Sequence, residues 1–482
     1  MGTLGQRVLR NTLALGGAQI VTLASGVVTT VVFARALGPV NYGIIGFGIA
    51  LISYLGLLTN MGMDVHGVRE IPRSSSHGRR LTQLIISTRL IFAGLLFVCL
   101  FFVSPYLGWP AMTRNVILIQ GVGILGVALT VDFYFQAEQR MGIAALRQSS
   151  AAILGAVLVL ALVSDASDIY LAASIPIIVN VFTALILLLY FWSYSKSNSA
   201  PQGELSRKKF VRKAAPLALM GILMTMYLNM DIIILGYLVN EYDLGLYVAA
   251  TRISLIAMVI PNLLHSAFLP ALSKVRDDDL LVLKAAENHA RTVSFFGGAV
   301  GGAGVVLAPI LVNVFFGDSF KGADSVLIIL MVYVFLFHIA ACFGTPLVAW
   351  QCDKPYMVIM IVSVALNVGL NFFLIPIFGI TGAAVATLIT QFVICIGVMV
   401  AAHKALGIKH YGLIARAVII TTLAVGVFCA GSYMWPTWSE FDSFIALIGG
   451  GGIYVSIYLA FALSSGMIKL SELRRLTTLY AN

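Results

Sequence analysis

The sequence contains few charged residues for its length. Only 10% of its 482 residues are Asp, Glu, Lys or Arg, and 60% are hydrophobic, whereas about 25% of the residues of a typical soluble domain are charged. A soluble core of this composition would leave large apolar areas facing water. The composition therefore excludes a soluble globular protein and predicts a protein surrounded mainly by lipid.

The sequence also lacks the patterns of a disulfide framework, a zinc site or a catalytic domain. Its five cysteines are scattered, mostly within apolar segments, with no CxxC spacing. The seven histidines are spread out, and no nucleophile elbow or phosphate-binding loop is present. The loops between apolar runs are too short for an enzymatic domain, so we expect a protein that is not an enzyme and has no cofactor.

Apolar runs of about 20 residues dominate the chain, which is the length needed to cross ~30 Å of hydrocarbon. Only helices can satisfy the backbone in so many separate spans. We therefore predict an all-α polytopic membrane protein with 14 transmembrane helices. The expected spans are 11–34, 43–62, 84–104, 116–137, 148–164, 169–193, 214–237, 246–268, 291–313, 323–348, 356–376, 380–402, 412–434 and 443–465.

The positive charges predict the orientation of these helices. With the N-terminus inside, 25 of the 30 Lys and Arg residues fall on inner segments and three (Arg35, Arg114 and Lys321) on outer loops. This bias matches the positive-inside rule, so we expect both termini on the cytoplasmic side of the cytoplasmic membrane. The net charge of +10 is then an orientation signal, and no nucleic-acid partner is expected.

The basic stretch at 194–213 divides the first twelve predicted helices into six plus six. The predicted regions are an N-terminal lobe (1–194), a cytoplasmic linker (195–213), a C-terminal lobe (214–402), and helices 13 and 14 with a cytoplasmic tail (403–482). A weak similarity between ALGPVNYGIIGFGIALIS and YLVNEYDLGLYVAATRIS favours two lobes of the same topology.

Four polar side chains share one predicted depth in the outer half of the bilayer. They are Asp231, Asn367, Asn371 and Thr387, and the two asparagines lie four residues apart on one helix face. Carboxylate, amide and hydroxyl oxygens at one level suit a hard cation such as Na⁺. The alternative is that the asparagines hold helices together and that Asp231 pairs with Arg252.

Several arginines are candidates for holding an anionic group. Arg252 and Arg89 each lie about six residues inside a predicted helix, where a guanidinium could bind pyrophosphate with paired donors. Snorkelling or local ion pairing is the alternative for both. Arg69 and Arg73 lie at an inner helix end, where an orientation role also explains them, whereas Arg35 lies on the outer side against the bias.

The motifs FARALGPVNYG, GVREIPR, DFYFQAEQRM, DIIILGYLVNEYDLGLYVAATRI, FLPALSK, FFGDSF and LNFFLIPIFGITGAAVATLIT occur in that order. Over residues 1–400 the chain resembles the polysaccharide-export flippases of the multidrug/oligosaccharidyl-lipid/polysaccharide exporter superfamily. The resemblance implies a V-shaped pair of six-helix lobes plus two C-terminal helices. It also implies cation-coupled movement of a polyprenyl-diphosphate-linked oligosaccharide from the inner to the outer leaflet, with contact to polysaccharide assembly proteins left open.

The resemblance also implies roles for particular residues. The related lipid II flippases have a sodium site whose matching positions here are Asp231, Asn367, Asn371 and Thr387, with the carbonyl of Ala383. Asn371 departs from that pattern, because an acidic residue stands there in the relatives. Arg252 matches a cavity arginine of the same relatives.

Two other classes of protein share part of this pattern. A multidrug/cation antiporter of the same superfamily would share the fold, but a cationic drug favours an acidic cavity, and the charges here lean to Arg. A membrane-embedded glycosyltransferase would need a large outer loop, and the predicted outer loops are short.

Overall fold

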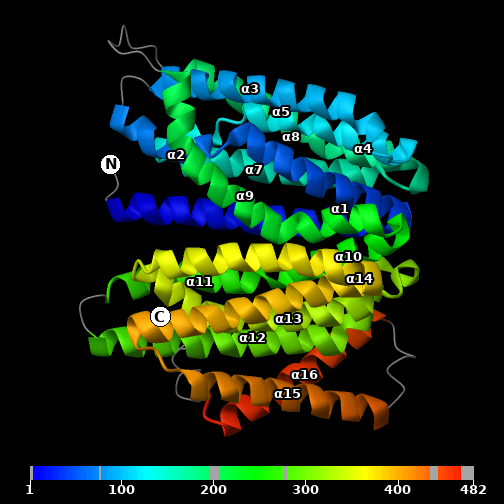
Figure 1. The fold of residues 1–482 in the computed structure, drawn as a ribbon, viewed down its shortest axis with the longest axis vertical. Coiled ribbons are helices and arrows are strands. Elements are labelled where there is room, and N and C mark those ends of the chain that lie inside the picture. The colour runs from blue at the N-terminus through cyan, green and yellow to red at the C-terminus, as the bar shows by residue number, and fades with distance from the viewer. Residues whose placement is uncertain (1–3, 75–77, 196–205, 276–278, 435–442, 468–482) are drawn as a thin grey trace. The chain divides into compact units, whose positions relative to one another are not determined.

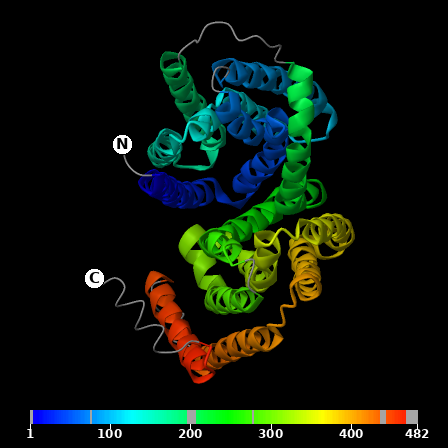
Figure 2. The same ribbon diagram turned by 90° about the vertical axis from the view of Figure 1, so that its left-hand side faces the viewer.

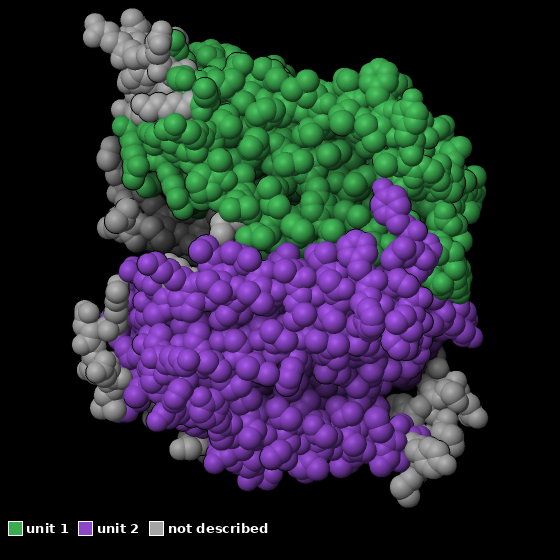
Figure 3. Space-filling view, in the orientation of Figure 1, with its two compact units in different colours: residues 1–236, 240–245 green, residues 237–239, 246–482 purple. Residues whose placement is uncertain are grey.

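The computed structural model describes residues 4–74, 78–195, 206–275, 279–434 and 443–467. These residues form helices, as predicted (Figure 1). The chain divides into two compact units, which are coloured separately in Figure 3. Unit 1 consists of residues 1–236 and 240–245, and unit 2 of residues 237–239 and 246–482. The predicted lobe and linker boundaries remain a prediction.

Unit 1 is built around its first helix. Its helices are α1 (Leu4–Asn60), α2 (Met63–Glu70), α3 (Gly78–Val103), α4 (Ala111–Gly121), α5 (Gly123–Leu129), α6 (Asp132–Ala137), α7 (Met141–Leu162), α8 (Ile169–Tyr194) and most of α9 (Arg207–Leu238). Helix α1 packs against α7, α4, α5 and α3, and α8 packs against α7, α5 and α4.

Unit 2 has α12 and α13 at its centre. Its helices are most of α10 (Glu241–Ala257), α11 (Val259–Ser273), α12 (Asp279–Phe316), α13 (Ala323–Ala349), α14 (Asp353–Leu406), α15 (Tyr411–Met434) and α16 (Ser443–Ser464). Helix α13 packs between α12 and α14, and α15 and α16 pack against α12 and each other. Figure 2 shows this last pair in orange and red.

Within the described residues, twelve helical stretches are long and apolar enough to cross a bilayer. Two of them, Gly16–Arg73 with 58 residues and Lys354–Leu406 with 53, far exceed the ~20 residues that one crossing needs. Each contains a glycine whose backbone leaves the helical region, Gly38 at φ 71° and Gly379 at φ 57°. Glycine tolerates positive φ because it has no Cβ. The prediction of an all-α polytopic membrane protein is confirmed.

Two predicted spans are interrupted. The span 116–137 is divided into α4, α5 and α6, and Thr130, after α5, is extended at φ −67° and ψ 135°. The span 246–268 is divided into α10 and α11 at Met258. Pro261 explains the second break, because proline has no N–H to donate to the carbonyl of the residue four positions earlier.

Helix α16 is fixed to α12 by two tyrosines. The Tyr454 hydroxyl donates to the carbonyl of Gly298 at 2.9 Å, and the Tyr458 hydroxyl donates to the carbonyl of Phe295 at 2.9 Å. A Cβ on Gly302 would lie 1.8 Å from the Tyr454 hydroxyl. Small residues on α12 therefore let the tyrosine rings reach its backbone.

We expect Gly302→Ala to destabilise the protein by about 1–3 kcal/mol, because the added methyl group displaces Tyr454 from its hydrogen bond. The measurement is thermal melting in detergent, with Gly426→Ala on α15 as control, since a Cβ there meets nothing within 4 Å. A Gly302→Ala protein that melts at or above the wild-type temperature would contradict this packing.

Candidate functional site

The connection between α1 and α2 brings two polar side chains together. Helix α1 ends at Asn60, and the chain turns through Met61 and Gly62, which have φ of 45° and 70°. Asn60 Oδ1 accepts from the backbone N–H of Asp64 at 3.2 Å, and Asn60 Nδ2 donates to Asp64 Oδ2 at 3.0 Å. The two side chains therefore hold each other at the start of α2.

Arg89 of α3 binds this pair. Its side chain is fully buried, and Nη2 donates to Asn60 Oδ1 at 2.5 Å and forms an ion pair with Asp64. Nη1 donates to the Thr130 carbonyl at 3.2 Å, and the guanidinium lies 5.1 Å from the centroid of the Phe133 ring. The carbonyl is available because α5 ends before Thr130. Most of the guanidinium is thus held by protein groups.

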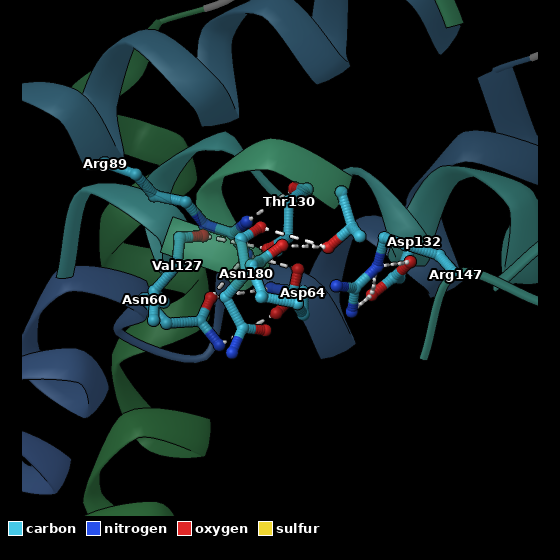
Figure 4. A network of polar contacts seen from close by, with 10 residues as sticks. Asn60, Asp64, Arg89, Val127, Thr130, Asp132, Arg147 and Asn180 are labelled. Atoms are coloured by element: carbon cyan, nitrogen blue, oxygen red, sulfur yellow. Dashed lines mark hydrogen bonds and ion pairs between the residues drawn. The ribbon is translucent and has the colours of Figure 1, made fainter. Parts of the chain in front are cut away.

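A second ion pair lies in the same unit. Arg147 of α7 donates from Nε to both carboxylate oxygens of Asp132, at 2.8 and 3.0 Å, and from Nη2 at 2.5 Å. Figure 4 shows this pair beside the group formed by Arg89, Asp64 and Asn60. The N–H groups along one edge of the planar guanidinium are spaced to match the two oxygens of a carboxylate. Because Asp132 begins α6, the pair fixes α6 to α7.

Next to the Arg89 network, unit 1 contains a cavity of about 570 Å³. Helices α1, α4, α5 and α8 form its wall, and Asn60 and Thr130 belong both to the wall and to the network. Five lining residues carry hydrogen-bonding side chains, and the others are apolar or glycine. The five are Ser53, Asn60, Gln120, Thr130 and Asn180.

Unit 2 contains a buried row of amide and hydroxyl groups. Asn371 Nδ2 donates to Asn367 Oδ1 at 3.0 Å, and Asn367 Nδ2 donates to the Thr390 hydroxyl at 3.3 Å. The Thr390 hydroxyl in turn donates to the carbonyl of Ala386 at 2.8 Å. Among the described residues, Asn371 Oδ1 has no hydrogen-bond partner although it is buried. This oxygen remains available to a donor or a cation.

The other predicted cation ligands belong to α14 and to α9. Ala383 is buried and Thr387 is half-buried in α14, one turn before Thr390. Asp231 belongs to α9 in unit 1, where Oδ1 accepts from the backbone N–H of Ile232 at 2.8 Å. The structure brings Asn367 and Asn371 together, and the complete cation site remains a prediction.

The predicted anion-binding arginines differ in their surroundings. Arg252 in α10 is half-buried and makes no hydrogen bond or ion pair with the part of unit 2 that the structure describes. Arg35, Arg69 and Arg73 are exposed. Arg89, by contrast, already binds protein acceptors.

Sequence reasoning did not identify Asn60, Asp64, Gln120 or Thr390 as site residues. Asn60 and Asp64 are four residues apart at the end of an apolar run, and this spacing was the available signal. Thr390 follows Thr387 by one helical turn, so it shares a similar face. Gln120 stands alone in an apolar run, and a lone amide gave no spacing pattern.

These features define an all-α polytopic membrane protein with polar groups buried inside both units. The fold resembles that of the lipid II flippase MurJ in an inward closed conformation, with a TM-score of 0.73 and 14% identity over 94% of this chain and 98% of that chain. It also resembles an inward-facing multidrug resistance MATE family transporter of the MOP superfamily, with a TM-score of 0.64 and 16% identity over 80% and 94%.

The family assignment comes from the sequence. Residues 8–276 match the family described as "Polysaccharide biosynthesis protein", and the chain belongs to this family. The probable flippase AglR of Haloferax volcanii is 24% identical over 397 residues, which cover 78% of this chain and 79% of that protein. A protein of Escherichia coli (strain K12), provisionally named an O-antigen transporter, is 22% identical over 367 residues, covering 74% and 87%. The protein belongs to a family of transporters and is not an enzyme.

We expect Asp64→Leu to destabilise unit 1, because the variant leaves the buried Arg89 guanidinium without its counter-charge. The expected loss is roughly 2–4 kcal/mol, near the lower end for a broken buried pair because Asp64 is partly exposed. The double variant Arg89→Leu/Asp64→Leu should lose less stability than the sum of the two single variants. Thermal melting measures all three, and Arg80→Leu, an exposed arginine of α3, is the control. Strict additivity would show that the two side chains do not interact.

Proposed function

We propose that the protein moves a polyprenyl-diphosphate-linked oligosaccharide from the inner to the outer leaflet of the cytoplasmic membrane. The observation that carries this proposal is the family match over residues 8–276, together with relatives named as a flippase and as an O-antigen transporter that align over most of both chains. The similarity to a lipid II flippase fold over 94% of the chain supports a transporter for a lipid carrier.

The physical task is to carry a charged diphosphate and a hydrated glycan past hydrocarbon. Each charge in the bilayer centre is costly unless protein groups or water surround it. The polyprenyl tail can stay in the lipid while the polar part crosses within the protein. Alternating access performs this step if two lobes close one side before they open the other.

In this proposal Arg252 holds the diphosphate. Its guanidinium has no hydrogen-bond or ion-pair partner among the described residues of unit 2, and a guanidinium gives two parallel N–H donors to phosphate oxygens. Arg35, Arg69 and Arg73, which are exposed, are proposed to meet the diphosphate at the two membrane surfaces. Arg89 would contact it only if the bonds to Asn60 and Asp64 opened.

We also propose that the chain crosses the membrane fourteen times. The two long stretches that contain Gly38 and Gly379 would each cross twice, which adds two crossings to the twelve apolar stretches. An even number of crossings keeps both termini on one side, and the 25 inner Lys and Arg residues favour the cytoplasmic side. Helices 1–6 and 7–12 would form the two lobes, with helices 13 and 14 added to the second.

A monovalent cation is proposed to bias the return to the inward state. The candidate ligands are Asp231, Asn367, Asn371 and Thr387, with the carbonyl of Ala383. The unpaired, buried Oδ1 of Asn371 fits this role, since carbonyl-type oxygens suit a hard cation. With one carboxylate among the four side chains, the set suits a singly charged ion such as Na⁺. A multidrug antiporter would share the fold, but the family match favours a glycan carrier.

We expect Arg252→Ala to lower the rate of translocation at least tenfold, because the diphosphate loses its paired donors while desolvated. The assay follows a fluorescent lipid-linked oligosaccharide in proteoliposomes, and Arg252→Lys should restore part of the rate. The control is Arg416→Ala, an exposed arginine of α15. Unchanged translocation by folded Arg252→Ala protein would remove Arg252 from the substrate site.

We expect Na⁺ to raise the melting temperature of the wild type, because an ion bound by the native state stabilises it. Asp231→Asn and Asn371→Leu should each abolish this response, and K⁺ at the same concentration is the control for ionic strength. Asn262→Leu, an exposed amide of α11, should keep the response. A wild type that does not respond to Na⁺ would end the sodium proposal and leave the glycan proposal standing.

A further inference from the structure

The start of α3, the start of α7 and the end of α8 meet in unit 1. Arg79 is the second residue of α3, and Arg140 directly precedes α7. Trp192 and Tyr194 belong to the last turn of α8. All three helices lie in apolar stretches long enough to cross a bilayer, so their ends lie at the level of the lipid head groups.

Arg79 connects α3 to the end of α8. Its Nη1 donates to the carbonyl of Ser195 at 2.8 Å, and its guanidinium lies 5.0 Å from the centroid of the Trp192 ring. Arg79 is half-buried, whereas Trp192 is 40% exposed. Tryptophan is enriched at membrane–water interfaces because its ring is amphipathic. Arg79 is therefore held at the depth of lipid phosphate groups.

Arg140 lies over a second aromatic side chain of the same turn. Its guanidinium is 4.5 Å from the centroid of the Tyr194 ring, and Tyr194 stacks on Tyr190 with the ring centroids 6.0 Å apart. The side chain of Arg140 is exposed and makes no hydrogen bond or ion pair with any described residue. Contact with a ring leaves most of the five N–H donors of a guanidinium available to a ligand.

The connection between α6 and α7 fixes the backbone of Arg140. Gln139 has a φ of 56°, and the backbone N–H of Arg140 donates to the carbonyl of Phe135 at 2.7 Å. Phe135 is buried in one hydrophobic cluster with Tyr134 and Phe191. The exposed arginine is therefore attached to a packed aromatic core.

Both guanidinium groups share one electrostatic environment. Each interacts electrostatically with the hydroxyl of Tyr134, as does the carboxylate of Glu138. Glu138 is exposed and forms no ion pair with Arg79 or Arg140. Two arginines against one carboxylate leave an excess of positive charge around this hydroxyl, which favours binding of an anion.

We propose that this end of unit 1 binds the head group of an anionic phospholipid, with Arg79 and Arg140 donating to its phosphate oxygens. Basic pockets between transmembrane helices bind the head groups of anionic lipids in this way. The occupant is a lipid of the bilayer, because both arginines lie at the ends of apolar stretches beside the exposed rings of Trp192 and Tyr190. A bound phosphate links α3 to the start of α7 and so stabilises unit 1.

The test compares two phospholipids that differ in the charge of the head group. Binding of phosphatidylglycerol and of phosphatidylcholine, each with a fluorescent acyl chain, is measured on the full chain in detergent micelles. At about fivefold for each arginine near a phosphate, the wild type should bind phosphatidylglycerol roughly 25-fold more tightly. Arg79→Gln and Arg140→Gln should each lower this preference about fivefold, and the double variant should abolish it.

Arg140→Gln keeps the test decisive even if Arg79→Gln fails to fold. Arg140 is exposed, and its side chain makes no hydrogen bond or ion pair with a described residue, so its loss should leave the fold intact. Arg140→Lys retains the charge without the paired donors and should keep part of the preference. Arg416→Gln, an exposed arginine of α15 in unit 2, is the matched control and should keep all of it.

Equal binding of both phospholipids by the wild type would overturn the inference, as would a preference that survives unchanged in folded Arg140→Gln protein or that falls equally in Arg416→Gln. Soluble glycerol phosphate that competes as strongly as phosphatidylglycerol would assign the arginines to a soluble anion. Undecaprenyl diphosphate that displaces phosphatidylglycerol at equal concentration would assign them to the transported carrier. Either result would also overturn the inference, and the proposed transport function depends on neither.

Discussion

A guanidinium inside an apolar helix must be neutralised by the protein, because hydrocarbon offers no hydrogen bonds and does not screen charge. Unit 1 meets this requirement at Arg89 with three kinds of acceptor: a carboxylate, an amide oxygen and a backbone carbonyl. The carbonyl is that of Thr130, which is available because the helix stops there. The short turn through Met61 and Gly62 brings Asp64 back beside Asn60. The break in one span and the turn in another are therefore both tied to one buried charge.

Because unpaired polar groups are costly in an apolar surrounding, the polar side chains fall into two kinds. Some have their hydrogen bonds satisfied within the protein, and others have no partner among the described residues. The hydroxyls of Tyr454 and Tyr458 are satisfied by carbonyls of α12, so these contacts hold helices together. Gln120 Oε1 and Asn371 Oδ1 are buried oxygens that no described residue satisfies, and Arg252 has no polar partner in the described part of unit 2. Polar groups without a partner lower the stability of the folded protein. Of these groups, Asn371 Oδ1 and Arg252 are those to which the proposed cation and diphosphate are assigned.

The sequence was sufficient to predict the helical class and most of the apolar spans, because the length and composition of each run are local properties. It was not sufficient for the break at Thr130, where no proline or glycine marks the chain and a distant arginine takes the released carbonyl. It identified Asn367 and Asn371 by their spacing on one helix face, but it did not identify Thr390, whose hydroxyl accepts from Asn367. Partners between helices depend on rotation and packing, which hydrophobic patterns do not specify.

We propose that this chain carries a lipid-linked glycan across a bilayer. The most direct measurement reconstitutes the purified wild type in sealed vesicles that hold a fluorescent polyprenyl-diphosphate oligosaccharide. It then follows how fast the glycan on the inner leaflet becomes accessible to a membrane-impermeant glycosidase added outside. We predict that the glycan becomes accessible much faster in these vesicles than in protein-free vesicles. A rate equal to that of protein-free vesicles, with protein that still melts cooperatively, would contradict the account.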